Sequence, residues 1–114
     1  MLKKKMDKRC LDIINHYGPD HQKRIFSGEA DELRDAITEV ELRDQDYLCE
    51  RHEDMLIDEI ADVLVMLGQF IQYYDLPIDK IDKRIDFKLD RQEERMRNEG
   101  IHQTRVLGPV QREF

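Results

Sequence analysis

Apolar residues recur every three or four positions along most of the chain, which is the period of an amphipathic α-helix. No stretch shows the strict alternation of apolar and polar residues that is typical of a half-buried strand. The pattern therefore predicts an all-α protein. Four helices are expected, over about residues 3–17, 21–43, 54–74 and 78–98.

Glycine and proline define the expected helix ends. Gly18-Pro19 ends the first helix, because glycine readily adopts the left-handed conformation after a helix and proline cannot continue one. Leu76-Pro77 ends the third helix and Gly100 closes the fourth. The short connections indicate a four-to-five-helix bundle. We expect one helical domain over residues 1–100 and a C-terminal tail over residues 101–114, which shows no periodicity.

The third predicted helix contains the most apolar run of the chain, residues 58–67. Its apolar stripe is so wide that the helix is expected to be covered on nearly all sides. Three other amphipathic helices supply too little apolar surface to cover it. The sequence therefore predicts a bundle that is completed by homo-oligomerisation, most simply as a two-fold dimer.

Composition narrows the class of protein. The chain has 114 residues, of which 39% are charged, with a net charge of −7 and a pI near 5.1. This acidic balance argues against a nucleic-acid binder, which needs basic groups to neutralise phosphates. The longest apolar run is too short to cross a bilayer. Cys10 and Cys49 lack the spacing of metal ligands, so we expect reduced thiols, no disulfide and a cytoplasmic protein.

Two pairs of acidic residues share one pattern. Glu29 and Glu32 lie one helical turn apart in the second predicted helix, and thirty positions later Glu59 and Asp62 repeat this spacing in the third. Both pairs border the apolar stripe of their helix in the same phase, so they converge if the two stripes face each other. Alternatively these acids are only solvated, since the chain has 26 acidic residues.

Four converging carboxylates repel one another, and burial increases the free energy of holding them together. A hard divalent cation relieves both effects. Mg²⁺ prefers oxygen ligands and is often held jointly by carboxylates and a substrate phosphate. The sequence has neither His nor Cys near the four acids, which argues against Zn²⁺. The acid pairs therefore favour a magnesium site.

A site for magnesium and phosphate also needs positive side chains. Lys88, Arg91 and Arg95 share one face of the fourth predicted helix and are candidates for binding a phosphate chain. Alternatively this face is solvated, and its cations pair with neighbouring acids of the same helix.

The order of these motifs resembles that of a known family. Glu29-Ala-Asp-Glu32, followed by Glu59-Ile-Ala-Asp62, resembles the ExxE…ExxD signature of the MazG-like nucleotide pyrophosphohydrolases, in the all-α NTP pyrophosphatase superfamily. Gln22, seven positions before Glu29, and the segment Phe87–Arg91 also match residues that are frequent in this family. The similarity covers roughly residues 10–98.

The resemblance implies hydrolysis of a nucleoside triphosphate to the monophosphate and pyrophosphate with Mg²⁺, for which Mn²⁺ can substitute. It also implies a homodimer or homotetramer. Gly28 stands where the family often has a further acid, so that acid is missing here. By position, the implied metal ligands and catalytic residues are Glu29, Glu32, Glu59 and Asp62, and the implied phosphate-binding residues are Lys88 and Arg91.

Two alternatives stay open. Phosphoribosyl-ATP pyrophosphohydrolase shares the expected fold and the acid pairs, but it has a characteristic His after the second motif, and residues 64–69 of this chain contain none. The other alternative is a non-catalytic helical oligomerisation or interaction module, in which the acids only solvate or cap the helices.

Overall fold

The computed structural model describes residues 7–42 and 50–102 of the chain. Four helices account for nearly all of these residues, and no strand occurs in the two ranges. The prediction of an all-α protein is therefore confirmed for the described residues. The helices are α1 (Lys8–Tyr17), α2 (Pro19–Glu41), α3 (Glu50–Tyr73) and α4 (Ile78–His102).

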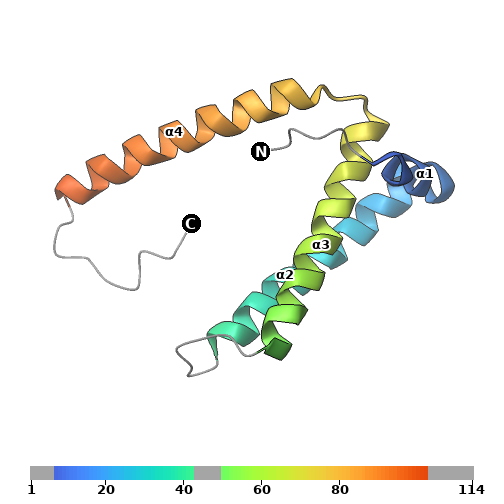
Figure 1. The fold of residues 1–114 in the computed structure, drawn as a ribbon, viewed down its shortest axis with the longest axis horizontal. Helices are drawn as coiled ribbons and strands as arrows, with labels where there is room; N and C mark the ends of the chain where they lie inside the picture. The colour runs from blue at the N-terminus through green and yellow to red at the C-terminus, as the bar shows by residue number, and fades with distance from the viewer. Residues whose placement is uncertain (1–6, 43–49, 103–114) are drawn as a thin grey trace. The chain divides into compact units, whose positions relative to one another are not determined.

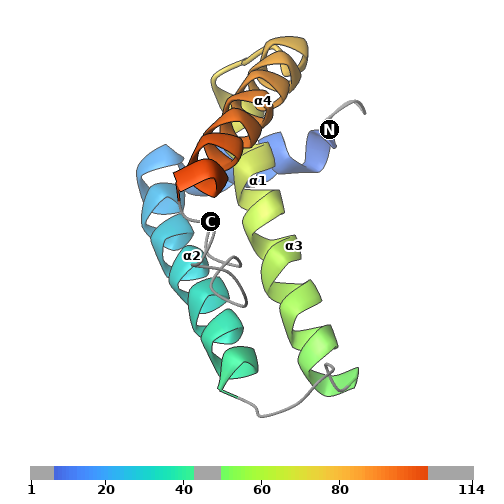
Figure 2. The same cartoon turned by 90° about the vertical axis from the view of Figure 1, so that its left-hand side faces the viewer.

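The chain divides into two units. Residues 4–77 form one unit, which contains α1, α2 and α3, and α4 belongs to the other. Within the first unit α2 and α3 lie side by side and run in opposite directions, and α1 packs against the end where α2 begins and α3 ends (Figure 1, Figure 2). α4 is one continuous helix of 25 residues. None of the described helices combines the length and the apolar composition that a membrane span requires.

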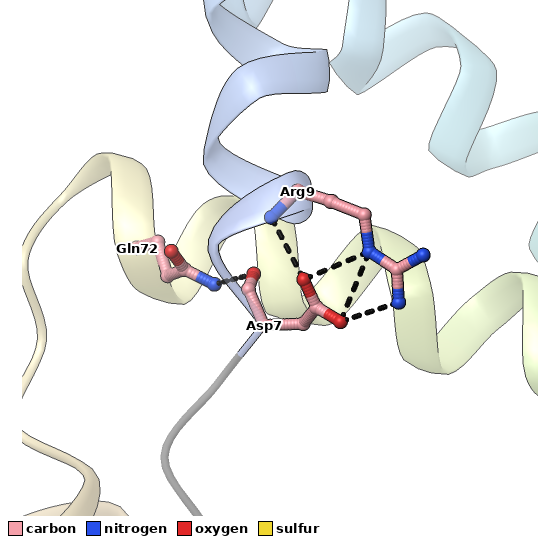
Figure 3. Close-up of polar contacts among 3 residues, drawn as sticks. All are labelled: Asp7, Arg9 and Gln72. Carbon is pink, nitrogen blue, oxygen red and sulfur yellow. Dashed lines mark hydrogen bonds and ion pairs between the residues drawn. The ribbon is translucent and has the colours of Figure 1, made fainter.

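Asp7 caps the start of α1. Its carboxylate accepts a hydrogen bond from the backbone N–H of Arg9 at 2.9 Å, which satisfies one of the N–H groups that a helix start leaves unpaired. The Arg9 guanidinium binds the same carboxylate, with 2.6 Å between Nη2 and Oδ2. The side-chain hydrogen bonds from Arg9, followed by its backbone hydrogen bond, lower the pKa of Asp7 to about 2. The Asp7 carbonyl accepts a hydrogen bond from Gln72 Nε2, which ties α1 to α3 (Figure 3).

A single residue, Gly18, joins α1 to α2. Its φ of 90° lies in a region that strains any residue with a Cβ atom, so this corner requires glycine. The Gly18 N–H donates to the Ile14 carbonyl at 2.8 Å, and the Gly18 carbonyl accepts from the Gln22 N–H at 3.0 Å. Pro19 occupies the first turn of α2, where a missing N–H loses no helical hydrogen bond. Gly18 therefore closes one helix and opens the next.

α3 ends in a Schellman motif. The Leu76 N–H donates to the Ile71 carbonyl at 2.9 Å, and the Asp75 N–H donates to the Gln72 carbonyl at 3.1 Å. Asp75 has a φ of 51°, the left-handed conformation that glycine usually adopts at this position. Pro77 follows and cannot continue the helix. The predicted end of this helix at Leu76-Pro77 is confirmed.

The helix bounds differ from the prediction at several ends. α1 begins at Lys8 rather than near residue 3, because the Asp7 carboxylate caps the helix there. α2 begins at Pro19 rather than near residue 21, because proline fits the first turn. α3 begins at Glu50 rather than near residue 54, so residues 50–53, expected to be a connection or a frayed helical extension, are helical. The prediction that Gly100 closes the last helix is wrong, since α4 continues to His102. Glycine ends a helix by adopting a positive φ, and among the described glycines only Gly18 does so.

The best-buried side chains belong to the first unit. The buried apolar residues include Ile14, which is 0% exposed, and Met66, which is 4% exposed. Gln22 and Gln69 are buried as well, although they are polar. Cys10 is a buried free thiol, whereas Cys49 lies outside the described residues.

α3 leaves a broad apolar face exposed. Ile57, Ile60, Leu64 and Leu67 follow a helical spacing of three and four residues, and each is more than 40% exposed. In a single copy of the chain, α1 and α2 cover only the opposite face of α3, which carries Met66 and Gln69. The prediction that this helix is covered on nearly all sides includes a second copy of the chain, so it stays a prediction.

Candidate functional site

Three of the four predicted acids meet between α2 and α3. Glu29 comes from α2, and Glu59 and Asp62 come from α3. One carboxylate oxygen from each lies within 4.8 Å of the others. The expectation that the two acid motifs converge is therefore met for these three residues, which are called the acidic triad below.

The antiparallel packing of α2 and α3 places these acids. Gln22, seven residues before Glu29, donates a hydrogen bond from Nε2 to Oε1 of Gln69, seven residues after Asp62, at 2.9 Å. Seven residues are close to two helical turns, so the same register holds at the amide pair and at the triad. The ring of Phe26, four residues after Gln22, packs edge to face against the ring of Phe70, which follows Gln69, with 6.1 Å between centroids.

The acidic triad is partly buried. Glu29 and Glu59 are half-buried, whereas Asp62 is exposed and opens the group to solvent. Glu29 Oε2 and Glu59 Oε2 are both buried, and neither has a hydrogen-bond partner. A buried carboxylate oxygen without a donor is unfavourable, because it loses its hydration and gains nothing in return. The triad therefore holds two oxygen atoms whose bonding capacity the protein itself leaves unused.

The environment favours protons on two of these carboxyls. Burial raises the pKa of Glu29, and the charges of Asp62, Glu32 and Glu59 raise it further. A hydrogen bond with Asp62 adds to this effect on the pKa of Glu29, since it requires that one carboxyl is protonated. The pKa of Glu59 is raised by burial first, then by the charges of Glu32, Asp62 and Asp58.

Glu32, the fourth predicted acid, lies beside the triad but is not part of it. It is exposed on α2 and is absent from the set of oxygens that lie within 4.8 Å of one another. Its charge nevertheless helps to raise the pKa of both Glu29 and Glu59. Glu32 therefore contributes to the negative potential of the site.

Lys88 and Arg91 lie on α4, in the second unit, and both are exposed. The Arg91 guanidinium lies 5.7 Å from the centroid of the Phe87 ring, and that of Arg84 lies 4.6 Å from the same centroid. Two guanidinium groups on one ring are a cation–π arrangement that the sequence analysis did not predict. The sequence shows the spacing that permits this arrangement, since Arg84 lies three residues before Phe87 and Arg91 lies four residues after it.

The donor set of the triad suits a hard cation. It offers carboxylate oxygens and no nitrogen or sulfur ligand, which matches the preference of Mg²⁺ and Mn²⁺ rather than of Zn²⁺. The two unpartnered oxygens are the atoms that a cation would satisfy. Three carboxylates leave several coordination positions for water or a phosphate, as Mg²⁺ sites commonly do.

The buried partner of Gln22 was not predicted from the sequence. Gln69 is 1% exposed and accepts the hydrogen bond from Gln22, while its own Nε2 donates to Met66 Sδ at 3.4 Å. The signal was an amide within the most apolar helix of the chain, since a polar side chain in such a position needs a partner.

Comparisons with models of protein families, with curated proteins and with solved structures find no match to this chain.

Proposed function

We propose that the chain is a Mg²⁺-dependent nucleoside triphosphate pyrophosphohydrolase of the MazG-like type. The observation that carries the proposal is the acidic triad, whose two glutamates each hold a buried oxygen without a partner. The ExxE…ExxD resemblance contributes the reaction, and the acid pairs from two antiparallel helices agree with it.

In this proposal Glu29, Glu59 and Asp62 hold the metal, and Glu32 adds negative charge or a ligand beside them. A bound Mg²⁺ would supply charge neutralisation for the phosphates and would lower the pKa of a water molecule. Hydrolysis would join the oxygen of that water to the α-phosphorus and break the bond from this phosphorus to the bridging oxygen, so the monophosphate and pyrophosphate would form and a proton would pass to solvent. The half-buried glutamates fix the position of the cation, whereas the exposed Asp62 lies on the side from which a nucleotide enters.

Lys88 and Arg91 bind the phosphate chain in this proposal. A triphosphate carries more negative charge than one divalent cation neutralises, so the site needs further positive groups. Both side chains are exposed on α4 and free to contact a ligand from solution. Lys88→Ala and Arg91→Ala are expected to raise KM for the triphosphate, whereas the exposed Lys80→Ala serves as a control on the same helix.

A homodimer or homotetramer completes the proposal. The exposed apolar face of α3 consists of Ile57, Ile60, Leu64 and Leu67. These residues lie together on one helix face, whereas exposed apolar residues that need no explanation are scattered singly over a surface. A second copy of the chain that covers this face would bury it symmetrically. Leu64→Lys is expected to shift the protein towards the monomer in sedimentation velocity, whereas Lys83→Ala on α4 should not. A wild-type protein that sediments as a monomer at micromolar concentration would contradict the oligomer.

The activity is tested by pyrophosphate release from standard, deoxy and damaged nucleoside triphosphates with Mg²⁺. Asp62→Ala should abolish release, and because Asp62 is exposed the variant should stay folded. Asp54→Ala is the matched control, since it removes another exposed acid from α3 two turns earlier. An active Asp62→Ala variant, or no release by the wild type with any triphosphate, would overturn the proposal.

The second candidate function is a non-catalytic helical interaction module. The exposed apolar face of α3 favours it, because such a face suits a protein partner as well as a second copy. This reading predicts that millimolar Mg²⁺, with or without a non-hydrolysable triphosphate, leaves the thermal midpoint unchanged. The enzyme reading predicts that the midpoint rises, since a ligand that binds only the folded state stabilises it.

A further inference from the structure

A chain of hydrogen bonds runs from the surface into the core beside the acidic triad. His21 Nδ1 donates to Gln22 Oε1 at 2.7 Å, Gln22 Nε2 donates to Gln69 Oε1 at 2.9 Å, and Gln69 Nε2 donates to Met66 Sδ at 3.4 Å. Gln22 and Gln69 are only 4% and 1% exposed. They therefore form a buried, directional polar contact between α2 and α3.

The acidic triad requires that α2 and α3 keep one register. Apolar contacts are non-directional, and their stripes repeat every three or four residues, so they fit almost as well after a slip of one turn. Such a slip moves one helix by about 5.4 Å along the other. That distance exceeds the 4.8 Å within which the three carboxylate oxygens lie, so the triad would be dispersed.

The triad itself opposes the register that forms it. Without a cation, Glu29 repels Glu59 and Asp62, so the charges of the triad do not stabilise the register in which it forms. Some other contact must therefore make the slipped register unfavourable. The amide pair does so, because a slip would leave two buried amides without their partner, which is far less favourable than exchanging one apolar contact for another.

We infer that the buried Gln22–Gln69 pair sets the register of α2 against α3, and that both residues are positioning residues for the acidic triad. Gln22 lies two turns from Glu29, and Gln69 lies two turns from Asp62, so neither side chain is itself a ligand. A buried polar residue is known to fix helix register in coiled coils, where it selects one pairing among several apolar ones. The link to metal binding rests on the proposed function, whereas the register does not.

The test replaces both amides by methionine. Gln22→Met/Gln69→Met keeps side-chain length and volume but removes the hydrogen bond, so the helices should still form and pack. Nuclear Overhauser effects between the rings of Phe26 and Phe70 report the register without metal, because the two rings pack edge to face in the wild type, with 6.1 Å between their centroids. We expect these effects to be lost in the double variant. Calorimetric titration with Mg²⁺ or Mn²⁺ alone should show an affinity weakened by about tenfold or more.

Gln72→Leu is the matched control. Gln72 also lies on α3 and donates an interhelical hydrogen bond, but to the Asp7 carbonyl in α1 (Figure 3). It should therefore leave the Phe26–Phe70 contact and the metal affinity unchanged. If the methionine variant does not fold, Gln22→Asn provides the same test, since it keeps the amide and withdraws it by one carbon–carbon bond.

Two results would overturn the inference. One is a folded Gln22→Met/Gln69→Met variant that keeps the wild-type Phe26–Phe70 contact. The other is a shifted register with an unchanged metal affinity. A wild-type protein that binds no metal, together with a variant whose register shifts, would instead refute the proposed function and leave the register role of the amide pair standing.

Discussion

Neutralising Glu29 should stabilise the metal-free protein while abolishing its response to Mg²⁺. In the wild type the Glu29 carboxylate lies within 4.8 Å of two others and holds a buried oxygen without a partner. Glu29→Gln keeps the shape of the side chain and removes its charge. The amide can also donate a hydrogen bond to a neighbouring carboxylate, which the wild-type carboxylate cannot do.

The expected change in the free energy of unfolding follows from the distance between the charged carboxylates. Two unit charges about 4 to 5 Å apart repel by about 1 kcal/mol in water, and screening by salt reduces this value for a group that is partly exposed. With two neighbours, we expect Glu29→Gln to raise the free energy of unfolding by about 1 kcal/mol, or the thermal midpoint by about 4 °C. In the wild type, Mg²⁺ at a hundred times its Kd should add about 2.7 kcal/mol. The variant should lose most of this addition.

The assay is thermal unfolding followed by circular dichroism at neutral pH, with a chelator and then with millimolar Mg²⁺. Asp31→Asn is the matched control, because it removes a carboxylate that lies two residues from Glu29 on α2, pairs with Arg34 at 3.3 Å and lies outside the triad. The control should gain no stability and should keep the full Mg²⁺ response. A Glu29→Gln variant that is less stable than the wild type without metal, or that responds to Mg²⁺ as the wild type does, would contradict this prediction.

Further predictions concern pH and one helix end. Without metal, the thermal midpoint should fall as the pH rises from 4.5 through the raised pKa values of Glu29 and Glu59, because their protons are bound more tightly in the folded state, and Glu29→Gln should weaken this trend. Asp7 acts in the opposite sense, since its pKa is lowered from 3.8 to about 2. It stabilises the fold fully above pH 3.8, and this stabilisation is lost as the pH falls through 2. Asp7→Ala should remove this pH dependence of stability in an acid titration. Asp75→Gly should raise the free energy of unfolding by about 0.5–1 kcal/mol, because it relieves a left-handed residue, and a loss of stability in urea unfolding would contradict this.

The sequence was most informative where one residue type has few structural options. Gly18-Pro19 and Leu76-Pro77 each predicted a helix end, and both ends are confirmed, because proline and left-handed glycine restrict the backbone directly. The prediction that Gly100 ends the last helix was wrong. Glycine permits a helix end but does not require one, and the long charged sequence around Gly100 stays helical up to His102.

The acidic triad could be predicted in part. The matched phase of the two acid motifs indicated that Glu29, Glu59 and Asp62 would meet, and they do. The same phase placed Glu32 in the group, but a spacing of three residues turns it by about 60° from Glu29, and it lies on the exposed side of α2. Periodicity alone does not say which acid of a pair faces the partner helix, since that depends on the exact rotation of each helix.

The register of α2 against α3 could not be predicted from the apolar pattern. That pattern gives each helix a face but fits several offsets along the axis. The offset is visible only in contacts that join distant residues, such as the amide pair of Gln22 and Gln69 and the ring pair of Phe26 and Phe70.

The shared corner at Gly18 has a consequence for how the protein opens in its native state. Helix ends normally fray and exchange their amide hydrogens quickly. At this corner the Gly18 N–H donates to the Ile14 carbonyl of α1, the Gly18 carbonyl accepts from the Gln22 N–H of α2, and Gln22 is also buried in the core. The end of α1 and the start of α2 should therefore exchange together and slowly. Local opening of the pair should begin at its other end, near Glu41 and Glu50, and reach the acidic triad before it reaches the corner.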